Sequence, residues 1–413
     1  MNATTPSIQP GSLPGSQRSL FTLAAVLAAV GVAAFVTGLL GPQPQRAWQA
    51  FFINFLLWSA IAQGAVLFAA LTHTVKARWA GPLSGLSQAF AGFFPLSLIC
   101  FLALLIGRDH LFPWLHEDLH GKEVWLNIPF LFTRDGIGFL VLYGIGWAFL
   151  SQDLKLKLGT SGPGGGLRRL LAGRIPQNDA DIQRVQSRKS LWGGLYCFAF
   201  AVVLSLIGFD LVMSMDPHWV STLFGAYHFV KAFYVGLGAL IILAAIVHLR
   251  RGGSAGIAAA HFHDVGKLFF AFCLLWADFF YVQLTVIWYG NIPEETHYVI
   301  LRTILPPWNS LAWTVFIMAF IIPFIVLINK RVKTRPRFMM ALCAMVILAM
   351  WLEHLLLLGP AWDPAAAAVP LSITDGLIFI GFLGLMALAV AGMLKTFPEL
   401  VPAPREGMSE GLN

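Results

Sequence analysis

Residues 266–290 read GKLFFAFCLLWADFFYVQLTVIWYG, a run long enough to cross a bilayer that carries a carboxylate near its middle. A spanning helix needs about 20 apolar residues. A carboxylate at that depth is costly, so we expect Asp278 to be paired, protonated or facing water. Tyr281 and Thr285 follow at helical spacing and share its face. We interpret this helix as one wall of a polar site inside a membrane protein; a structural hydrogen bond between helices is the alternative.

The composition is typical of a polytopic membrane protein. Of the 413 residues, 58% are hydrophobic and 11% are charged, against about 25% charged in soluble domains. The mean hydropathy is +0.74. A separate soluble domain therefore has little room. The net charge of +7 does not indicate nucleic-acid binding, because the positive residues gather in loops on one side of the membrane.

Apolar segments recur along the chain and predict an all-α polytopic membrane protein with ten transmembrane helices. The predicted spans cover residues 20–40, 48–71, 83–107, 128–150, 191–213, 220–247, 266–288, 309–328, 338–358 and 373–395. They form a single transmembrane domain over 20–395, between a disordered tail at 1–19 and a second tail at 396–413. Lys and Arg concentrate in both tails and in the even-numbered loops, which predicts that both termini are cytoplasmic.

A weak internal repeat indicates how the spans are grouped. GAVLFAALTH (64–73) ends the second span, and the similar GALIILAAIVH (238–248) ends the sixth. The fifth and ninth spans each carry an acid near the outer end, Asp210 and Glu353, and an Asp-Pro follows each span. These echoes predict two four-helix bundles, spans 2–5 and 6–9, with the first and last helices peripheral.

Ionisable residues inside the predicted spans lie in the outer half of the membrane, whereas the inner half carries only Lys267. The outer set is Arg134, Asp135, Asp210, His228, Lys231, Asp278, Glu353, His354 and Asp375. Unpaired charges are costly at this depth, so we expect Arg134 to pair with Asp210 or Glu353. A Lys231–Asp278 pair is our first expectation for the next helices along the chain. Pairing alone does not explain why so many costly groups lie at one level.

A polar pocket entered from the lipid is the functional interpretation of this set. Quinol oxidation releases protons as electrons leave, so a His or carboxylate near the headgroup is the natural acceptor. The proton-handling candidates are Asp278, His228, Asp135, Glu353, His354 and Asp210. The quinol-binding candidates are His228, Tyr281, Tyr227 and Asp278. We expect Arg134 and Lys231 to balance charge, and Glu353 with His354 to offer an exit toward the outer side.

Two other functional classes remain open. A stand-alone ion- or proton-coupled secondary transporter would also bury acids near mid-depth. A pure membrane anchor would use the same acids only for assembly.

Metal chemistry in this chain is not expected, because the four cysteines fall in different spans without a CxxC pair. The histidine spacings do not stack two haems along one helix pair.

Four stretches resemble the NrfD/PsrC-like membrane subunits of alternative complex III. They are WQAFFINFLLWSAIAQGAVLF (48–68), VWLNIPFLFTRDGIGFLVLYG (124–144), MSMDPHWVSTLFGAYHFVKAFY (213–234) and WADFFYVQLTVIWYGNIPEE (276–295). The similarity extends from the second to the tenth span and is closest to the shorter of the two such subunits, called ActF. It implies ten helices in two four-helix bundles.

The resemblance also implies a function and partners. The expected function is that of a membrane subunit of a quinol:cytochrome c, or other periplasmic acceptor, oxidoreductase in a bacterial respiratory or photosynthetic chain, located in the inner membrane. The expected partners are a second NrfD-like membrane subunit, an iron–sulfur protein, c-type cytochromes and, as a further partner, a terminal oxidase. Quinol or menaquinol would be the substrate, with haem c and iron–sulfur clusters in the partner subunits. This chain would supply a quinol site or a proton path and would not be catalytic alone.

Overall fold

The computed structural model describes residues 17–119, 121–158, 165–251 and 256–403. Most of the predicted tails, residues 1–19 and 396–413, lies outside these ranges. Within them the chain is helical and free of strands, and ten helices are long and apolar enough to cross a membrane. The predicted all-α polytopic membrane protein is thereby confirmed at the level of helix type and number.

The ten spans match the predicted segments in order. They are α1 (Gln17–Leu39), α2 (Pro44–Thr74), α3 (Gly81–Gln88) continued by α4 (Phe94–Leu111), α5 (Ile128–Leu158), α7 (Asp179–Leu211), α8 (Phe224–Arg250), α9 (Ala259–Gly290), α11 (Trp308–Phe316) continued by α12 (Ile322–Ile328), α14 (Pro336–Trp362) and α15 (Ile373–Thr396). Shorter helices between them include α6 (Leu167–Ala172), α10 (Pro293–Thr303) and α13 (Lys330–Lys333).

Helix α2 is the central element of the molecule. In its most apolar 18-residue stretch, 94% of the residues are buried. The helix packs against α4, α7, α8 and α15. The contact with α8 depends on two glycines, since a Cβ at Gly64 would lie 2.1 Å from the Ala232 carbonyl oxygen. A Cβ at Gly236 would lie 2.3 Å from the backbone of Gly64. Only glycine at both positions lets the two backbones approach this closely.

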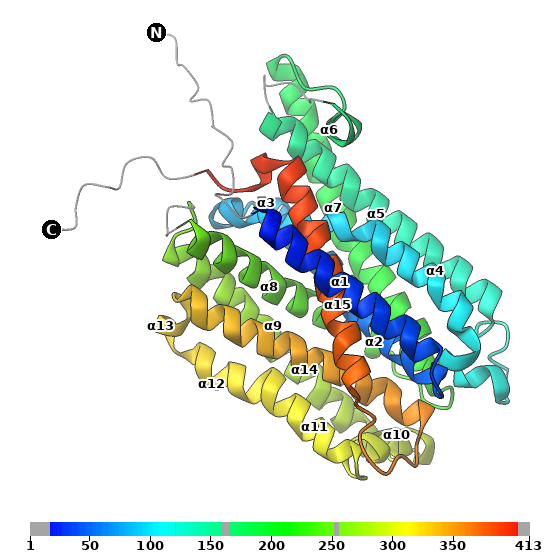
Figure 1. The fold of residues 1–413 in the computed structure, drawn as a ribbon. Coiled ribbons are helices and arrows are strands. Elements are labelled where there is room, and N and C mark those ends of the chain that lie inside the picture. The colour runs from blue at the N-terminus through cyan, green and yellow to red at the C-terminus, as the bar shows by residue number, and fades with distance from the viewer. Residues whose placement is uncertain (1–16, 120, 159–164, 252–255, 404–413) are drawn as a thin grey trace, which may run out of the picture.

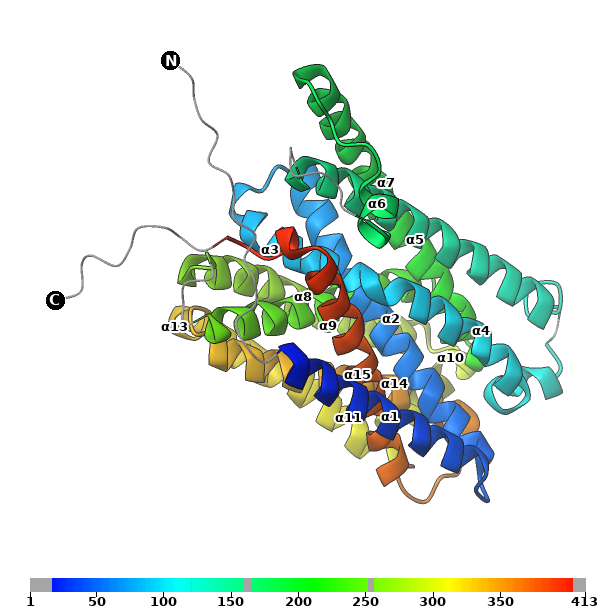
Figure 2. The ribbon, with the colours of Figure 1, turned by 45° about the horizontal axis from the view of Figure 1, so that its top comes forward.

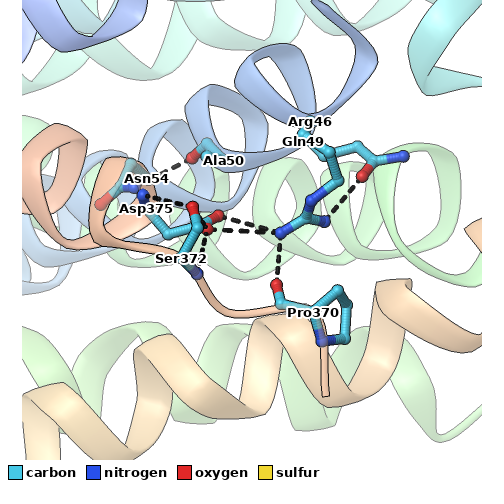
Figure 3. Close-up of polar contacts among 7 residues, drawn as sticks. All are labelled: Arg46, Gln49, Ala50, Asn54, Pro370, Ser372 and Asp375. Atoms are coloured by element: carbon cyan, nitrogen blue, oxygen red, sulfur yellow. Dashed lines mark hydrogen bonds and ion pairs between the residues drawn. The ribbon is translucent and has the colours of Figure 1, made fainter. Parts of the chain in front are cut away.

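The remaining helices divide between the two sides of the α2–α8 contact. Helices α4 and α5 lie on the α2 side, and α9, α11, α12 and α14 lie on the α8 side (Figures 1 and 2). Helix α7 packs against both α2 and α8. Helices α1 and α15 pair with each other along the outside of α2. A polar contact joins α15 to the start of α2: Arg46 of α2 bonds to Asp375 of α15 (3.1 Å) and to the Pro370 carbonyl (Figure 3). Asp375 also caps α15 through Ser372, so its role here is structural.

The eighth span is interrupted because Pro323 lies inside it. A π-helical turn, residues 317–321, joins α11 to α12 just before this proline. Proline has no N–H, so it cannot donate to the carbonyl one turn earlier. That carbonyl, of Ala319, instead accepts a hydrogen bond from the Tyr234 hydroxyl of α8 (3.1 Å). The break in the helix is thus stabilised by a neighbour, as membrane helices require.

Helices α5 and α7 extend beyond the predicted spans and bury a charged residue where they do so. Helix α5 ends at Leu158 and α7 begins at Asp179, so much of the loop expected at 151–190 is helical. Asp153 becomes a buried residue of α5, with Lys189 at 2.6 Å and Lys157 at 2.8 Å. Gln88 of α3 donates to the same carboxylate (2.8 Å). The predicted fourth span ends at residue 150, so the sequence did not predict that the helix continues to Leu158 and buries Asp153.

Candidate functional site

Glu353 is the centre of a buried polar cluster between α8, α9 and α14. It is 2% exposed. One carboxylate oxygen accepts hydrogen bonds from the Tyr227 hydroxyl and from the Trp276 indole N–H (3.1 Å). The other lies 3.0 Å from the Lys231 ammonium as an ion pair. Tyr227 and Lys231 are four residues apart on α8, so they reach Glu353 from one helical face.

The Lys231–Asp278 pair predicted from sequence is wrong. Lys231 pairs with Glu353 of α14, while Asp278 faces outward from α9. Matching depth on consecutive helices is not enough to make a pair, because the rotation of each helix decides which side chains meet. Trp276, two residues before Asp278, points inward in its place and donates to Glu353.

Two histidines complete this first cluster. His228 and His354 are each 1% exposed. The His354 Nδ1–H donates to the Met350 carbonyl of its own helix (2.7 Å), because a carbonyl can only accept. His228 packs against α7 where Gly208 leaves space, since a Cβ there would lie 2.7 Å from the His228 Cβ. Within the described ranges, His228 Nδ1 and His354 Nε2 have no hydrogen-bond partner.

A second cluster joins α5 to α7. The Arg134 Nε–H donates to Asp210 at 2.6 Å, which confirms one of the two predicted partners for Arg134. Asp210 also accepts from the Trp125 indole N–H (2.8 Å), and the guanidinium lies 4.0 Å from the centre of that indole ring. Asp135 is fully buried beside them, and its carboxyl group lies against that of Asp210.

A large apolar cavity lies between α9 and the α11–α12 span. Its volume is about 760 Å³. Asp278 and Tyr281 line it together with hydrophobic side chains, which include Leu274, Leu275, Phe280, Leu284, Phe316 and Phe320. Tyr281 is 68% exposed, so the cavity opens at the outer surface of these membrane-spanning helices. We call it the lipid-side cavity.

A smaller chamber adjoins the lipid-side cavity and leads toward Glu353. Its volume is about 60 Å³, and the two spaces share Phe280, Leu284 and Thr303 as walls. Tyr227 forms part of its lining, and so do Gln283, Tyr298 and Arg302. We call this space the inner chamber. Tyr227, which donates to Glu353, is thus part of the wall of the inner chamber.

Arg302 of α10 closes the far side of the inner chamber. It is 3% exposed, and its N–H groups donate to the carbonyls of Leu357 (3.0 Å) and Tyr298 (3.1 Å). Its guanidinium lies 3.7 Å from the Asp216 carboxylate. It also stacks over the Tyr298 ring, which itself stacks on Trp219. Burial raises the pKa of Tyr298 to about 12, against the opposing effect of Arg302, so this phenol stays protonated at neutral pH.

Sequence reasoning misses Arg302 because the charge lies in a connection between spans, where lysines and arginines are usually solvated. The signal was the apolar and aromatic residues of α10, with Tyr298 four positions before Arg302 on one helical face. That pattern favours a helix packed on the bundle rather than a free loop. Gln283 of α9 is also missed, because the sequence analysis considers ionisable residues in the spans and an amide is not ionisable.

The predicted site residues thus fall into three places. The Glu353 cluster contains Tyr227, His228, Lys231, Glu353 and His354. The lipid-side cavity contains Asp278 and Tyr281, and the α5–α7 cluster contains Arg134, Asp135 and Asp210. Among the described residues, no group of three or more His, Cys, Asp or Glu is arranged to hold a metal ion.

No protein family model matches the chain, and a search of curated proteins gives no match either.

Proposed function

We propose that this chain is a membrane subunit of a quinol-oxidising electron-transfer complex and binds quinol in the lipid-side cavity. The observation that carries the proposal is the position of this cavity, open to lipid at one end and adjoining the inner chamber beside Tyr227 at the other. Its volume of about 760 Å³ falls within the range of about 300–1,000 Å³ typical of small-molecule sites.

The lining suits an amphiphile with a long apolar tail. Leucine and phenylalanine side chains of α9, α11 and the π-helical turn supply the apolar surface for an isoprenoid chain. Asp278 and Tyr281 supply an acceptor and a hydroxyl for the headgroup. A carboxylate that faced only lipid would be costly, and a bound hydroxyl group or water would offset that cost at Asp278.

Proton transfer in the proposed site uses two carboxylates. Asp278 lies in the cavity and would accept a proton directly from the headgroup hydroxyl. Glu353 would accept the second proton through the Tyr227 hydroxyl, which already donates to it. The Lys231 ammonium lies 3.0 Å from the other Glu353 oxygen and would balance the charge of this carboxylate. The electrons would leave through partner subunits, because quinol oxidation needs an acceptor.

The proposal includes an orientation and an arrangement in the membrane. The excess of Lys and Arg in the tails and even-numbered loops places both termini in the cytoplasm. The helix contacts support two four-helix bundles, α2–α4–α5–α7 and α8–α9–α11/α12–α14, with α1 and α15 outside. In this orientation the quinol site lies toward the outer side of a bacterial inner membrane. The partners would be a second membrane subunit, an iron–sulfur protein and c-type cytochromes.

Mild-detergent purification through a C-terminal tag tests the assignment to a complex. We expect c-type cytochromes, visible by haem staining, and an iron–sulfur protein to co-purify with the chain. A stable, colourless chain that purifies alone would contradict the assignment. In that case the secondary transporter becomes the better explanation of the buried acids, and uptake into proteoliposomes would be measured next.

Changing Asp278 to asparagine tests the proposed acceptor in the cavity. We expect the complex to assemble normally and quinol oxidation to slow by about 100-fold or more, the usual effect of losing a general base. Steady-state oxidation of decylubiquinol and menadiol by the purified complex measures this. Asp264→Asn is the matched control, because Asp264 lies at the opposite end of α9 and pairs with Lys267. Equal rates in the two variants would exclude Asp278 as the acceptor.

A further inference from the structure

We propose that the start of α9 and the short helix α13 form a binding site for the phosphate group of an anionic phospholipid. The site consists of His263 and Lys267 on α9 and Lys330 on α13, and we call it the α13 basic site. It lies at the end of the bundle that the proposed orientation places in the cytoplasm, and it does not depend on the proposed quinol site. The observation that carries the proposal is a group of lysines with too few acids around it, beside apolar side chains that face lipid.

Positive side chains from two helices converge at this site. The charges of Lys267, Lys330 and Lys333 all act on His263, so the four side chains lie close together. Among the described residues, Asp264 is the only acid whose charge also acts on His263, and it already pairs with Lys267 at 2.8 Å. Like charges that are held together repel one another. A bound anion would therefore stabilise this arrangement.

One of the three lysines has a structural role, and the other two are available to a ligand. Lys333 is 8% exposed and its ammonium donates to the Leu327 carbonyl (2.7 Å). It packs over Gly266 of α9, where a Cβ would lie 3.2 Å from the Lys333 Cγ, so it holds α13 against α9. Lys330 is exposed, and the Lys267 side chain is 56% exposed. An ammonium has three N–H donors, so Lys267 keeps two of them after its bond to Asp264.

Apolar side chains next to the lysines favour a lipid over a soluble phosphate. Ile325 and Ile328 at the end of α12 are 63% and 61% exposed, and Asn329 and Lys330 follow them directly. In a membrane protein, such a boundary between exposed apolar and charged residues lies at the level of the lipid headgroups. Basic pockets between helices at the cytoplasmic side are typical sites for anionic headgroups. An acyl chain would also cover the two isoleucines, which soluble phosphate cannot do.

A row of aromatic rings leads from the lysines along α9 and α12, which lie side by side (Figure 1). The Lys333 ammonium lies 5.5 Å from the centre of the Phe270 ring, which contacts Phe324 at 5.8 Å between ring centres. Phe324 in turn lies 5.4 Å from Phe320, which also lines the lipid-side cavity. All three phenylalanines are partly exposed. One acyl chain of the bound lipid can therefore follow this row toward the cavity while its headgroup stays at the lysines.

Native mass spectrometry of the purified full-length chain, titrated with phosphatidylglycerol, tests the headgroup site. We expect Lys267→Gln with Lys330→Gln to weaken phosphatidylglycerol binding by about tenfold or more, because each cation near an anionic headgroup contributes to binding. Phosphatidylcholine should bind weakly and equally to both proteins. Lys267→Arg with Lys330→Arg should bind as the wild type does. The glutamine variant should also unfold at the wild-type temperature, because both side chains are exposed.

Arg169→Gln with Arg174→Gln is the matched control, because it removes two exposed cations between α5 and α7. An equal loss of phosphatidylglycerol in this control would reduce the effect to net charge and overturn the site. Unchanged binding in the Lys267 and Lys330 glutamine variant would overturn it as well. Inorganic phosphate is the third arm of the test. Displacement of the lipid by phosphate at equal concentration would overturn the assignment to a lipid.

Photo-crosslinking tests where the acyl chain lies. Phosphatidylglycerol with a diazirine in one acyl chain would be incorporated with the full-length chain into vesicles, irradiated and mapped by peptide mass spectrometry. We expect crosslinks to the peptides that contain Phe270, Phe320 and Phe324, and we expect them to be lost in Lys267→Gln with Lys330→Gln. Crosslinks spread equally over all lipid-facing helices would overturn the site. Neither experiment involves quinol, so a negative result here leaves the proposed function intact.

Discussion

Replacing Glu353 with leucine is expected to lower the free energy of unfolding by about 3–5 kcal/mol, because Lys231 is left charged and unpaired in the interior. The loss includes two hydrogen bonds, since the Tyr227 hydroxyl and the Trp276 indole N–H both donate to Glu353. Lys231→Met alone should lower the free energy of unfolding by a similar amount, because Glu353 then lacks its cationic partner in the interior. Thermal unfolding in detergent, followed by tryptophan fluorescence, measures both changes.

The double variant separates stability from function. Lys231→Met with Glu353→Leu removes both charges, and replacing a buried pair by apolar residues is often close to neutral. We expect it to be more stable than either single variant. If Glu353 also carries protons, quinol oxidation stays abolished in the double variant although the complex is assembled. Recovery of both stability and turnover would show that the pair is only a structural link between α8 and α14.

Replacing Arg134 with leucine is the second change with a large expected effect. Arg134 neutralises Asp210, which has no exposed side-chain surface, and it stacks on Trp125. Its loss leaves Asp210 without a counter-charge beside a second carboxyl group, Asp135. We expect the free energy of unfolding to fall by about 3–5 kcal/mol, as for other broken buried pairs.

Asp135→Asn is the contrasting change at the same place. The Asp135 carboxyl group lies against that of Asp210, and an amide of similar shape can donate to Asp210 in its place. We expect a change in stability of less than about 1 kcal/mol, the size of a typical neutral hydrogen bond. Parallel thermal unfolding of Arg134→Leu, Asp135→Asn and Asp210→Asn measures the difference. Equal losses for Arg134→Leu and Asp135→Asn would contradict the assignment of Arg134 as the pairing residue.

Hydropathy was enough to predict the ten spans, because a helix that crosses lipid must be apolar over about 20 residues whatever its neighbours are. Because an ionisable side chain inside a span is energetically costly, each one could be recognised from the sequence as a residue that needs a partner or a function. Arg134 could be assigned a carboxylate partner because an unpaired guanidinium there is so costly. The burial of Asp153 could not be predicted in the same way, because it depends on Lys157, Lys189 and Gln88, two of which lie on other helices.

The sequence by itself therefore determined that this is a ten-helix membrane protein. It also determined that most of the costly ionisable groups inside the predicted spans lie toward one end of the helices. The tertiary structure decided which of those groups meet. Lys231 pairs with Glu353 and not with Asp278, Asp278 lines a cavity, and Arg302 is buried. The physical reason is that depth follows from position along a single helix. Contact depends on the rotation and spacing of neighbouring helices, which close approaches such as Gly64 on Gly236 set between residues far apart in the chain.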